Sequence, residues 1–197
     1  MKIILMLGAI GLLLCGCSQE EEVKLSSDSK DKTHLITQAE NIDKSSYAGL
    51  EDVFLDTKHL YTQKDNKLTL FIFGKNNCPY CDKLKDDIKA NSTLKSMLQE
   101  HFLPYYINVS YNKKHILSIG EDTQEANTPE LMELYVKSPM RPTPSLIFIN
   151  AQGKSIYELP GYLPPETMQK LLAYMASGEW KGKSEEEIAT HINGALL

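Results

Sequence analysis

The chain of 197 residues carries 21 lysines and arginines against 26 aspartates and glutamates, which gives a formal net charge of −5 at pH 7. This mildly acidic balance, without a basic stripe, argues against a nucleic-acid-binding protein, so we expect no nucleic-acid partner. The length is sufficient for one domain with its own hydrophobic core, and the sequence contains no internal repeat.

The first sixteen residues are predicted to be a lipoprotein signal peptide. After one lysine, residues 3–14 are apolar but too few to span a bilayer comfortably. Gly16 then precedes Cys17, and this segment resembles the lipobox of bacterial lipoproteins, in which cleavage leaves the cysteine as an acylated first residue. Cys17 fits that role, whereas Cys15 follows Leu14 and does not. The alternative is an ordinary secretory signal, and either one exports the chain to an oxidising compartment.

Residues 17–44 are predicted to be a flexible tether between the lipid and a folded domain at 45–197. They are rich in Ser, Glu, Asp and Lys, with few apolar residues and no sustained period. A binding segment with its own specificity is the alternative, but no motif supports it.

The domain is expected to begin with a helix followed by a strand. Apolar residues recur at helix-like spacing between positions 50 and 61: Leu50, Val53, Phe54, Leu55, Leu60 and Tyr61. Asp65-Asn66-Lys67 interrupts this pattern, and the β-favouring run Leu68–Phe73 then predicts a strand.

A Cys-Pro-Tyr-Cys motif follows that strand. Gly74–Asn77 is a predicted loop, and Pro79 suits the first position of a helix, where its missing N–H would have no intrahelical partner. Cys78 would then lie at the helix N-terminus, which stabilises a thiolate and lowers its pKa. Cys81 lies one helical turn further on, close enough to form a disulfide. We therefore interpret Cys78 and Cys81 as a redox pair, with Cys78 as the nucleophile of thiol–disulfide exchange.

Three other interpretations of this pair are weaker. A zinc site would need two more ligands at close spacing, and the histidines are scattered singly at positions 34, 59, 101, 115 and 191. A structural disulfide would close a very short loop and constrain the unfolded chain little. An inert buried pair is disfavoured because the loop and proline should leave Cys78 at an exposed helix tip. With Cys15 removed and Cys17 acylated, one pair remains, which argues for chemistry rather than stability.

The second half of the chain alternates further helices and strands. Helices are predicted from Asn91-Ser92 to Phe102, from Thr128 to about Val136, from Thr167 to Met175, and after Ser184. Strands are predicted at Leu103–Val109 and as a hairpin of Leu146–Asn150 with Ser155–Leu159. The polar segment Ser110–Asn127 has no clear assignment.

This element order, with Cys-Pro-Tyr-Cys after a strand and Thr143-Pro144 before another, resembles the thioredoxin superfamily. The tail from Gly161-Tyr162 to Gly178 is similar to that of periplasmic thioredoxin-related proteins of the SoxW type. The resemblance implies an α/β thioredoxin-like fold, with a central mixed sheet flanked by helices and a helical insertion before the cis-proline strand. It covers roughly residues 45 to 190.

The resemblance also implies the site. Thr143-Pro144 would be a cis peptide facing the cysteines, and Pro79, Tyr80, Thr143 and Pro144 would bind an extended substrate. The alternative is a trans proline that opens an edge strand. One position departs from the family: many thioredoxins bury an acid six residues before the first cysteine, where this chain has Ile72. Lys75, the nearest ionisable residue on that side, is expected to be a solvated loop lysine.

The implied activity is thiol–disulfide exchange without any cofactor beyond the Cys78–Cys81 disulfide. We expect the protein to be lipid-anchored in the periplasm of a Gram-negative bacterium. Its partners would be exported proteins with disulfides, a membrane electron donor or acceptor, and the membrane itself. Reduction or isomerisation is favoured. The alternatives are a disulfide donor, a copper(I) metallochaperone with Met140 as a helper ligand, and a lipid-tethered binding module.

Overall fold

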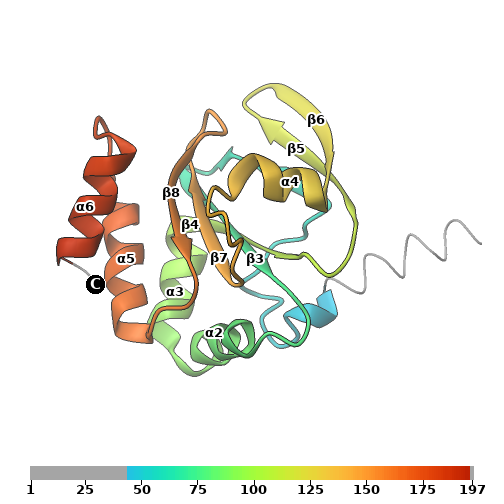
Figure 1. The fold of residues 1–197 in the computed structure, drawn as a ribbon, viewed down its shortest axis with the longest axis horizontal. Coiled ribbons are helices and arrows are strands. Elements are labelled where there is room, and N and C mark those ends of the chain that lie inside the picture. Colours follow the sequence, from blue (N-terminus) through green and yellow to red (C-terminus); the bar gives the residue numbers. More distant parts are fainter. Residues whose placement is uncertain (1–43, 196–197) are drawn as a thin grey trace, which may run out of the picture.

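Strand β3, Lys67–Gly74, lies at the centre of the fold in the computed structural model, which describes residues 44–195. It pairs in parallel with β4, Phe102–Asn108, and antiparallel with β7, Ser145–Ile149. Beyond β7 the sheet continues with β8, Ser155–Pro160, while the two-residue strand β2, Gln63–Lys64, folds back on the start of β3. This mixed sheet, with helices on both faces, confirms the predicted α/β architecture (Figure 1).

Both faces of β3 are buried, because successive side chains of a strand point to opposite faces. Leu70 and Ile72 belong to a hydrophobic cluster that includes residues of four helices, whereas Phe71 and Phe73 belong to a second cluster on the other face. The four helices are α2, Pro79–Ala90; α3, Ser92–His101; α5, Pro165–Ser177; and α6, Glu185–Ala195. On the opposite face lies α4, Thr128–Tyr135, the predicted helix before the proline strand (Figure 1).

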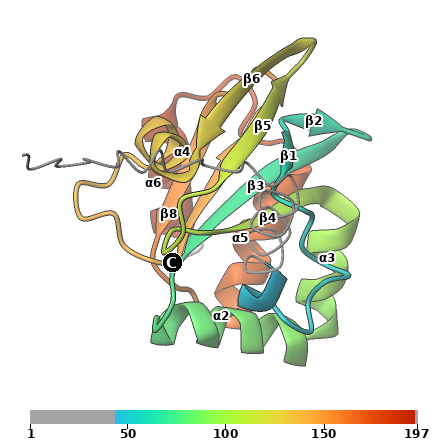
Figure 2. The ribbon, with the colours of Figure 1, turned by 90° about the vertical axis from the view of Figure 1, so that its right-hand side faces the viewer.

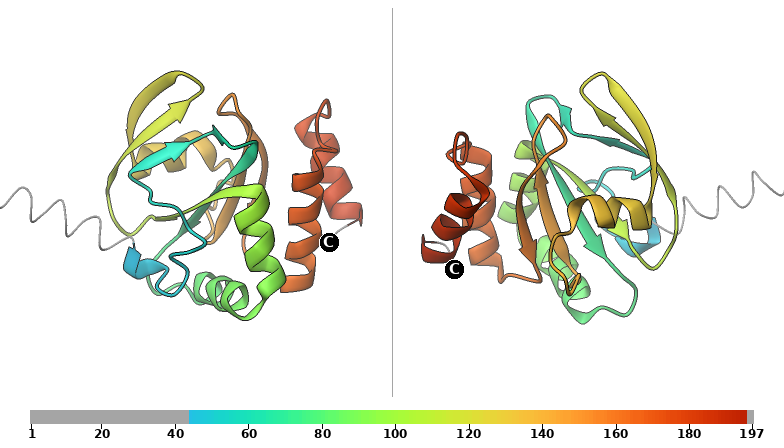
Figure 3. Two further views of the ribbon diagram at one scale, coloured as in Figure 1. Left: turned by 180° about the vertical axis from the view of Figure 1, so that it is seen from behind. Right: turned by 45° about the horizontal axis from the view of Figure 1, so that its top comes forward.

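A second, smaller sheet accounts for the segment that the sequence left unassigned. Strands β5, Lys114–Ile119, and β6, Asp122–Asn127, form an antiparallel hairpin, and β1, His59–Tyr61, pairs in parallel with β5. The hairpin extends past the main sheet in the views of Figures 2 and 3. Four of the six residues of β6 are exposed. Its side chains therefore show no alternation of apolar and polar residues that could reveal a strand.

The helix predicted over positions 50–61 is wrong. Leu50, Val53 and Phe54 are buried, but they lie in a series of turns, and the N–H of Leu55 donates to the carbonyl of Pro104 in β4 rather than to a helical turn. Leu60 is buried between two exposed neighbours in β1, a period of two. The apolar residues at helix-like spacing thus belong to a series of turns followed by a short strand.

The other predicted elements are confirmed, with small shifts at their ends. The caps explain two starts: the Asn91 side chain accepts from the N–H of Leu94 at 3.0 Å, and Asn127 and Glu130 form a capping box at α4. At the start of α6, the N–H of Ser184 donates to the Glu187 carboxylate and the N–H of Glu187 donates to the Ser184 hydroxyl. Among residues 44–195, no helix is long and apolar enough to cross a membrane. The predicted leader and nearly all of the tether lie outside the described residues.

Candidate active site

The two cysteines lie where the central strand passes into a helix. After β3 ends at Gly74, a short loop leads to Cys78, the N-cap of α2, whose backbone is extended, and Pro79 lies in the first helical turn. Cys78 and Cys81 form a disulfide with their Cα atoms 5.2 Å apart. The N–H of Cys81 donates to the sulfur of Cys78 at 3.2 Å, so the first cysteine caps the helix with its own sulfur.

The loop before β7 packs against this disulfide. The Thr143–Pro144 peptide is cis, as the resemblance implied, rather than trans. The carbonyl oxygen of Thr143 lies 3.3 Å from Cys78 Sγ, and the Thr143 hydroxyl donates to the same sulfur at 3.5 Å. Residues 65 positions apart in the sequence thus meet at one sulfur atom. A backbone carbonyl held there can pair with an extended chain, as strand-adding recognition requires.

The expectation that Cys78 lies at an exposed helix tip is wrong. Cys78 is only 3% exposed and Cys81 is fully buried, because the Thr143–Pro144 loop covers the sulfur from one side. Tyr80, between the two cysteines, is by contrast 63% exposed. The disulfide therefore lies just beneath the surface, with an exposed aromatic ring beside it.

Tyr162, which the sequence marked only as part of a family-like tail, is brought next to this motif. Its ring stacks on that of Tyr80 with centroids 6.0 Å apart, and its hydroxyl donates to Asp87 Oδ2 at 2.6 Å. The ammonium of Lys83 lies 5.3 Å from the centre of the same ring. Partial burial, together with the Asp87 carboxylate, raises the pKa of Tyr162. The exposed Tyr80 ring thus has a fixed neighbour.

A polar cavity of about 340 Å³ flanks the redox helix. Each residue that lines it carries a hydrogen-bonding side chain: Ser45, Ser46, Lys75, Asn76, Asn77, Asp82, Lys85, Tyr106 and Asn108. Its wall is held together by Asn108, whose amide donates to Ser46 Oγ at 2.6 Å and to Asn76 Oδ1 at 2.8 Å. The cavity adjoins the motif directly, since Asn77 precedes Cys78 and Asp82 follows Cys81.

Tyr106 connects this cavity to the core. It is paired in register with Ile72 of β3, and burial raises its pKa to about 12. Gly74 leaves room for its hydroxyl, because a Cβ on Gly74 would lie 2.1 Å from that oxygen. The hydroxyl is therefore neutral at physiological pH and points towards the end of β3 that leads into the cysteine motif.

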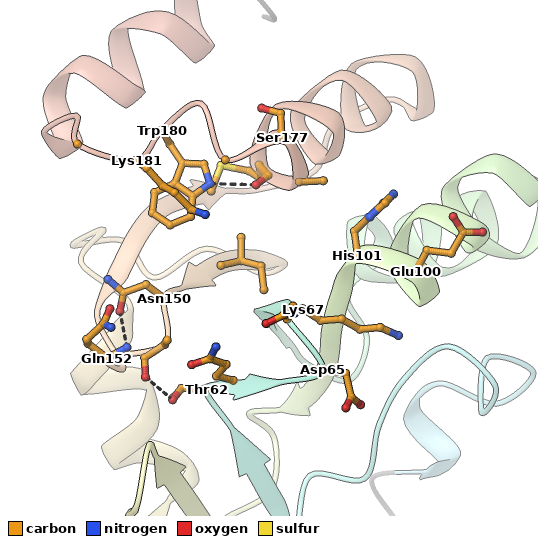
Figure 4. Close-up of a pocket in the computed structure, with 18 residues that line it drawn as sticks. Thr62, Asp65, Lys67, Glu100, His101, Asn150, Gln152, Ser177, Trp180 and Lys181 are labelled. Carbon is orange, nitrogen blue, oxygen red and sulfur yellow. Dashed lines mark hydrogen bonds between the residues drawn. The ribbon is translucent and has the colours of Figure 1, made fainter.

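A larger cavity, of about 600 Å³, lies at the other end of β3, among the C-terminal ends of α3 and α5 (Figure 4). Several of its polar groups are engaged within the chain. Trp180 Nε1 donates to the carbonyl of Met175, Lys67 Nζ to that of Gln99 and Thr62 Oγ1 to that of Ala151. This cavity lies away from the cysteines and does not contribute to the redox site.

The remaining predicted site residues are distributed as follows. Met140, the candidate helper ligand for copper, is 87% exposed in the loop before the cis peptide. Across residues 44–195, no group of three or more His, Cys, Asp and Glu side chains could hold a metal ion. The proposed lipidation site, Cys17, lies outside the described residues.

Both the sequence and the fold of the chain are similar to those of known proteins. Residues 55–176 match the family described as thioredoxin-like domain. A thioredoxin-fold protein from Helicobacter pylori is 35% identical, over 78% of this chain and 96% of that one, with a TM-score of 0.70. A thioredoxin from Thermus thermophilus is 16% identical, over 66% and 98% of the two chains, with a TM-score of 0.43. A disulphide isomerase from Xylella fastidiosa is 18% identical, over 82% and 90%, with a TM-score of 0.36. No curated protein compared with the chain matches it.

Proposed function

Because the chain belongs to the thioredoxin-like domain family, we propose that it is a thiol–disulfide oxidoreductase whose redox centre is Cys78 and Cys81. The observation that carries the proposal is the Cys78–Cys81 disulfide at the N-terminus of α2, beside the cis peptide of Thr143 and Pro144. A thiolate at a helix N-terminus is stabilised by the unpaired N–H groups there. Two donors, the Cys81 N–H and the Thr143 hydroxyl, already point at Cys78 Sγ.

The reaction follows from this arrangement. In the reduced protein, the Cys78 thiolate attacks one sulfur of a substrate disulfide, and the other substrate sulfur leaves as a thiolate. The Cys81 thiolate then attacks Cys78 Sγ, which forms the Cys78–Cys81 bond and releases the second substrate thiolate. Two electrons pass to the substrate, and the chain is left oxidised. Thr143 and Pro144 would hold the substrate chain by its backbone while Pro79 and Tyr80 contact it.

The proposed direction is reduction or isomerisation of disulfides in exported proteins, as in the periplasmic SoxW-like proteins that the sequence resembles. By analogy with that group, the protein would act in cytochrome c or sulfur-compound metabolism. Pro79 and Tyr80 occupy the positions between the cysteines, so no histidine adds a second charge there. We therefore expect a reduction potential between about −270 and about −180 mV. Such a protein needs a membrane electron donor to stay reduced outside the cytoplasm.

An insulin-reduction assay tests the activity. We expect the reduced protein to cleave the insulin disulfides catalytically with dithiothreitol as electron source, and absence of turnover would contradict the proposal. Titration of the reduced protein with copper(I) distinguishes the alternative, because a metallochaperone would bind copper tightly without reducing insulin.

Trapping free thiols in cells with acid and a bulky alkylating agent reports the direction of electron flow. A mostly reduced pool supports a reductase, whereas a fully oxidised pool would make the protein a disulfide donor.

We also propose that Cys17 anchors the protein to a membrane through a lipid. We expect Cys17→Ala to abolish the incorporation of labelled fatty acid in cells while the purified domain still reduces insulin. The reason is that Gly16-Cys17 follows an apolar run, and residues 17–44 separate it from the domain. Cys15→Ala is the matched control and should leave labelling unchanged. Fatty acid on the Cys17→Ala protein would contradict the assignment of Cys17 as the lipidation site.

A further inference from the structure

Cys81 must lose a proton before it can resolve a mixed disulfide, and its surroundings oppose ionisation. The residue is fully buried on the inner face of α2, where Leu84 and Ile88 are its buried neighbours. Burial disfavours the charged form of a thiol and raises its pKa. The resolving step of the proposed function, on which this inference rests, therefore needs a group that stabilises the Cys81 thiolate.

Lys85 is positioned to supply that stabilisation. It lies four residues after Cys81 on the same helix, and the Cβ atoms of such neighbours are about 5–6 Å apart. Side chains of helical residues lean back over the preceding turn. Lys85 does so, because its Nζ lies 3.0 Å from Asp82 Oδ1. The ammonium therefore lies beside the first turn of α2, in which Cys81 also lies.

The Lys85 side chain is held in this position. Only 16% of it is exposed, and its Nζ donates to the carbonyl of Ser46 at 2.8 Å. The same ammonium lies 5.5 Å from the centre of the Tyr106 ring. Tyr106 pairs in register with Ile72 of the neighbouring strand β3. A lysine from α2 thus contributes a fixed positive charge on the side of the sheet where Ile72 leaves no ionisable side chain.

The charged groups around this position are few. Lys85, Asp82 and Lys75 line the polar cavity beside α2, together with the neutral hydroxyl of Tyr106. Asp82 follows Cys81 directly and partly offsets the charge of Lys85. Cys81 does not itself line this cavity, but the next residue, Asp82, does, and the cavity volume of about 340 Å³ is large enough for water molecules.

We propose that Lys85 is the positioning residue that stabilises the Cys81 thiolate during resolution of the mixed disulfide. The Cys81 thiol gives its proton to a water molecule that reaches it from the neighbouring polar cavity, and the resulting thiolate is stabilised by the Lys85 ammonium. Its sulfur then forms the bond to Cys78 Sγ as the bond from Cys78 to the substrate sulfur breaks. The substrate sulfur leaves with the electron pair, so the cysteine pair is oxidised and the substrate disulfide is reduced.

The test measures the Cys81 thiol by itself. In the full chain with Cys15, Cys17 and Cys78 replaced by serine, Cys81 is the single thiol. Its pKa is read from the ultraviolet absorbance of the thiolate and from the pH dependence of alkylation by iodoacetamide. We expect Lys85→Met to raise this pKa by about one unit and to slow alkylation at pH 7 about tenfold.

Three further variants make the test specific. Lys85→Arg keeps the charge and should restore the original titration, and Lys83→Met, on the exposed face of the same helix, should leave it unchanged. Asp82→Asn removes the opposing charge and should lower the Cys81 pKa, a shift of opposite sign. If Lys85→Met fails to fold, Lys85→Gln decides, because it removes the charge but keeps a polar side chain, and an unchanged Cys81 pKa in this variant contradicts the proposal.

The role of Lys85 and the proposed function can fail independently of each other. An unchanged Cys81 pKa in Lys85→Met, with insulin still reduced by the chain that has both cysteines, would overturn the role of Lys85 alone. A chain that does not reduce insulin, although its Cys81 titration depends on Lys85, would overturn the proposed function alone.

Discussion

Cys81→Ala is expected to accumulate mixed disulfides with its substrates, while Cys78→Ala should form none. Cys78 Sγ lies at the N-terminus of α2 and has two donors directed at it, the N–H of Cys81 and the hydroxyl of Thr143. These donors stabilise a thiolate there, so Cys78 forms the bond to substrate. Without Cys81, nothing in the redox pair releases that bond. Either substitution should lower insulin turnover by about a thousandfold or more.

Non-reducing electrophoresis with mass spectrometry identifies the trapped species, and a reducing gel is the control because it should release each partner. The two single variants are matched, since each removes one sulfur and breaks the same disulfide. Equal alkylation rates of the two thiols in the reduced wild-type protein at neutral pH would contradict the assignment of Cys78 as nucleophile. Substrates trapped by Cys78→Ala, rather than by Cys81→Ala, would reverse the two roles.

Phe71→Ala is expected to remove a large part of the stability of the domain. Phe71 is fully buried in the central strand, and its ring contacts those of Tyr105 and Tyr135 edge to face, with centroids 5.7 and 5.2 Å away. Truncation removes these contacts and leaves a cavity that the sheet and α4 can fill only in part. The free energy of unfolding should fall by about 3–5 kcal/mol, a large share of the total for a small domain.

Urea unfolding followed by circular dichroism measures this loss, and the slope of the transition should stay close to that of the wild type. Leu134→Ala is the control, because Leu134 lies in α4 with 55% of its surface exposed, and its truncation should cost less than about 1 kcal/mol. A loss at Phe71 no larger than that at Leu134 would mean that the aromatic cluster on this face of the sheet adds little to stability.

Local sequence predicted most of the elements and the position of the cysteine pair. The β-favouring run Leu68–Phe73, the loop residues after it and Pro79, which suits a first helical turn, each carry a local conformational preference. The Asn91 cap acts over three residues and Pro129 suits a first helical turn, which is why the starts of α3 and α4 could be predicted. The prediction of the cis Thr143–Pro144 peptide required more, because it came from a family resemblance rather than from these neighbouring residues.

Features that depend on distant contacts were decided only by the tertiary structure. The sequence could not show that β1 would pair with β5, so the turns before it were mistaken for a helix. Nor could it show that the Thr143 loop would cover Cys78, since 65 residues separate them. The stacking of Tyr80 on Tyr162 and the position of Lys85 near Tyr106 also depend on contacts between segments that are distant in the sequence. A short-range pattern determines how a segment folds, but which segments meet depends on the topology of the whole sheet and its helices.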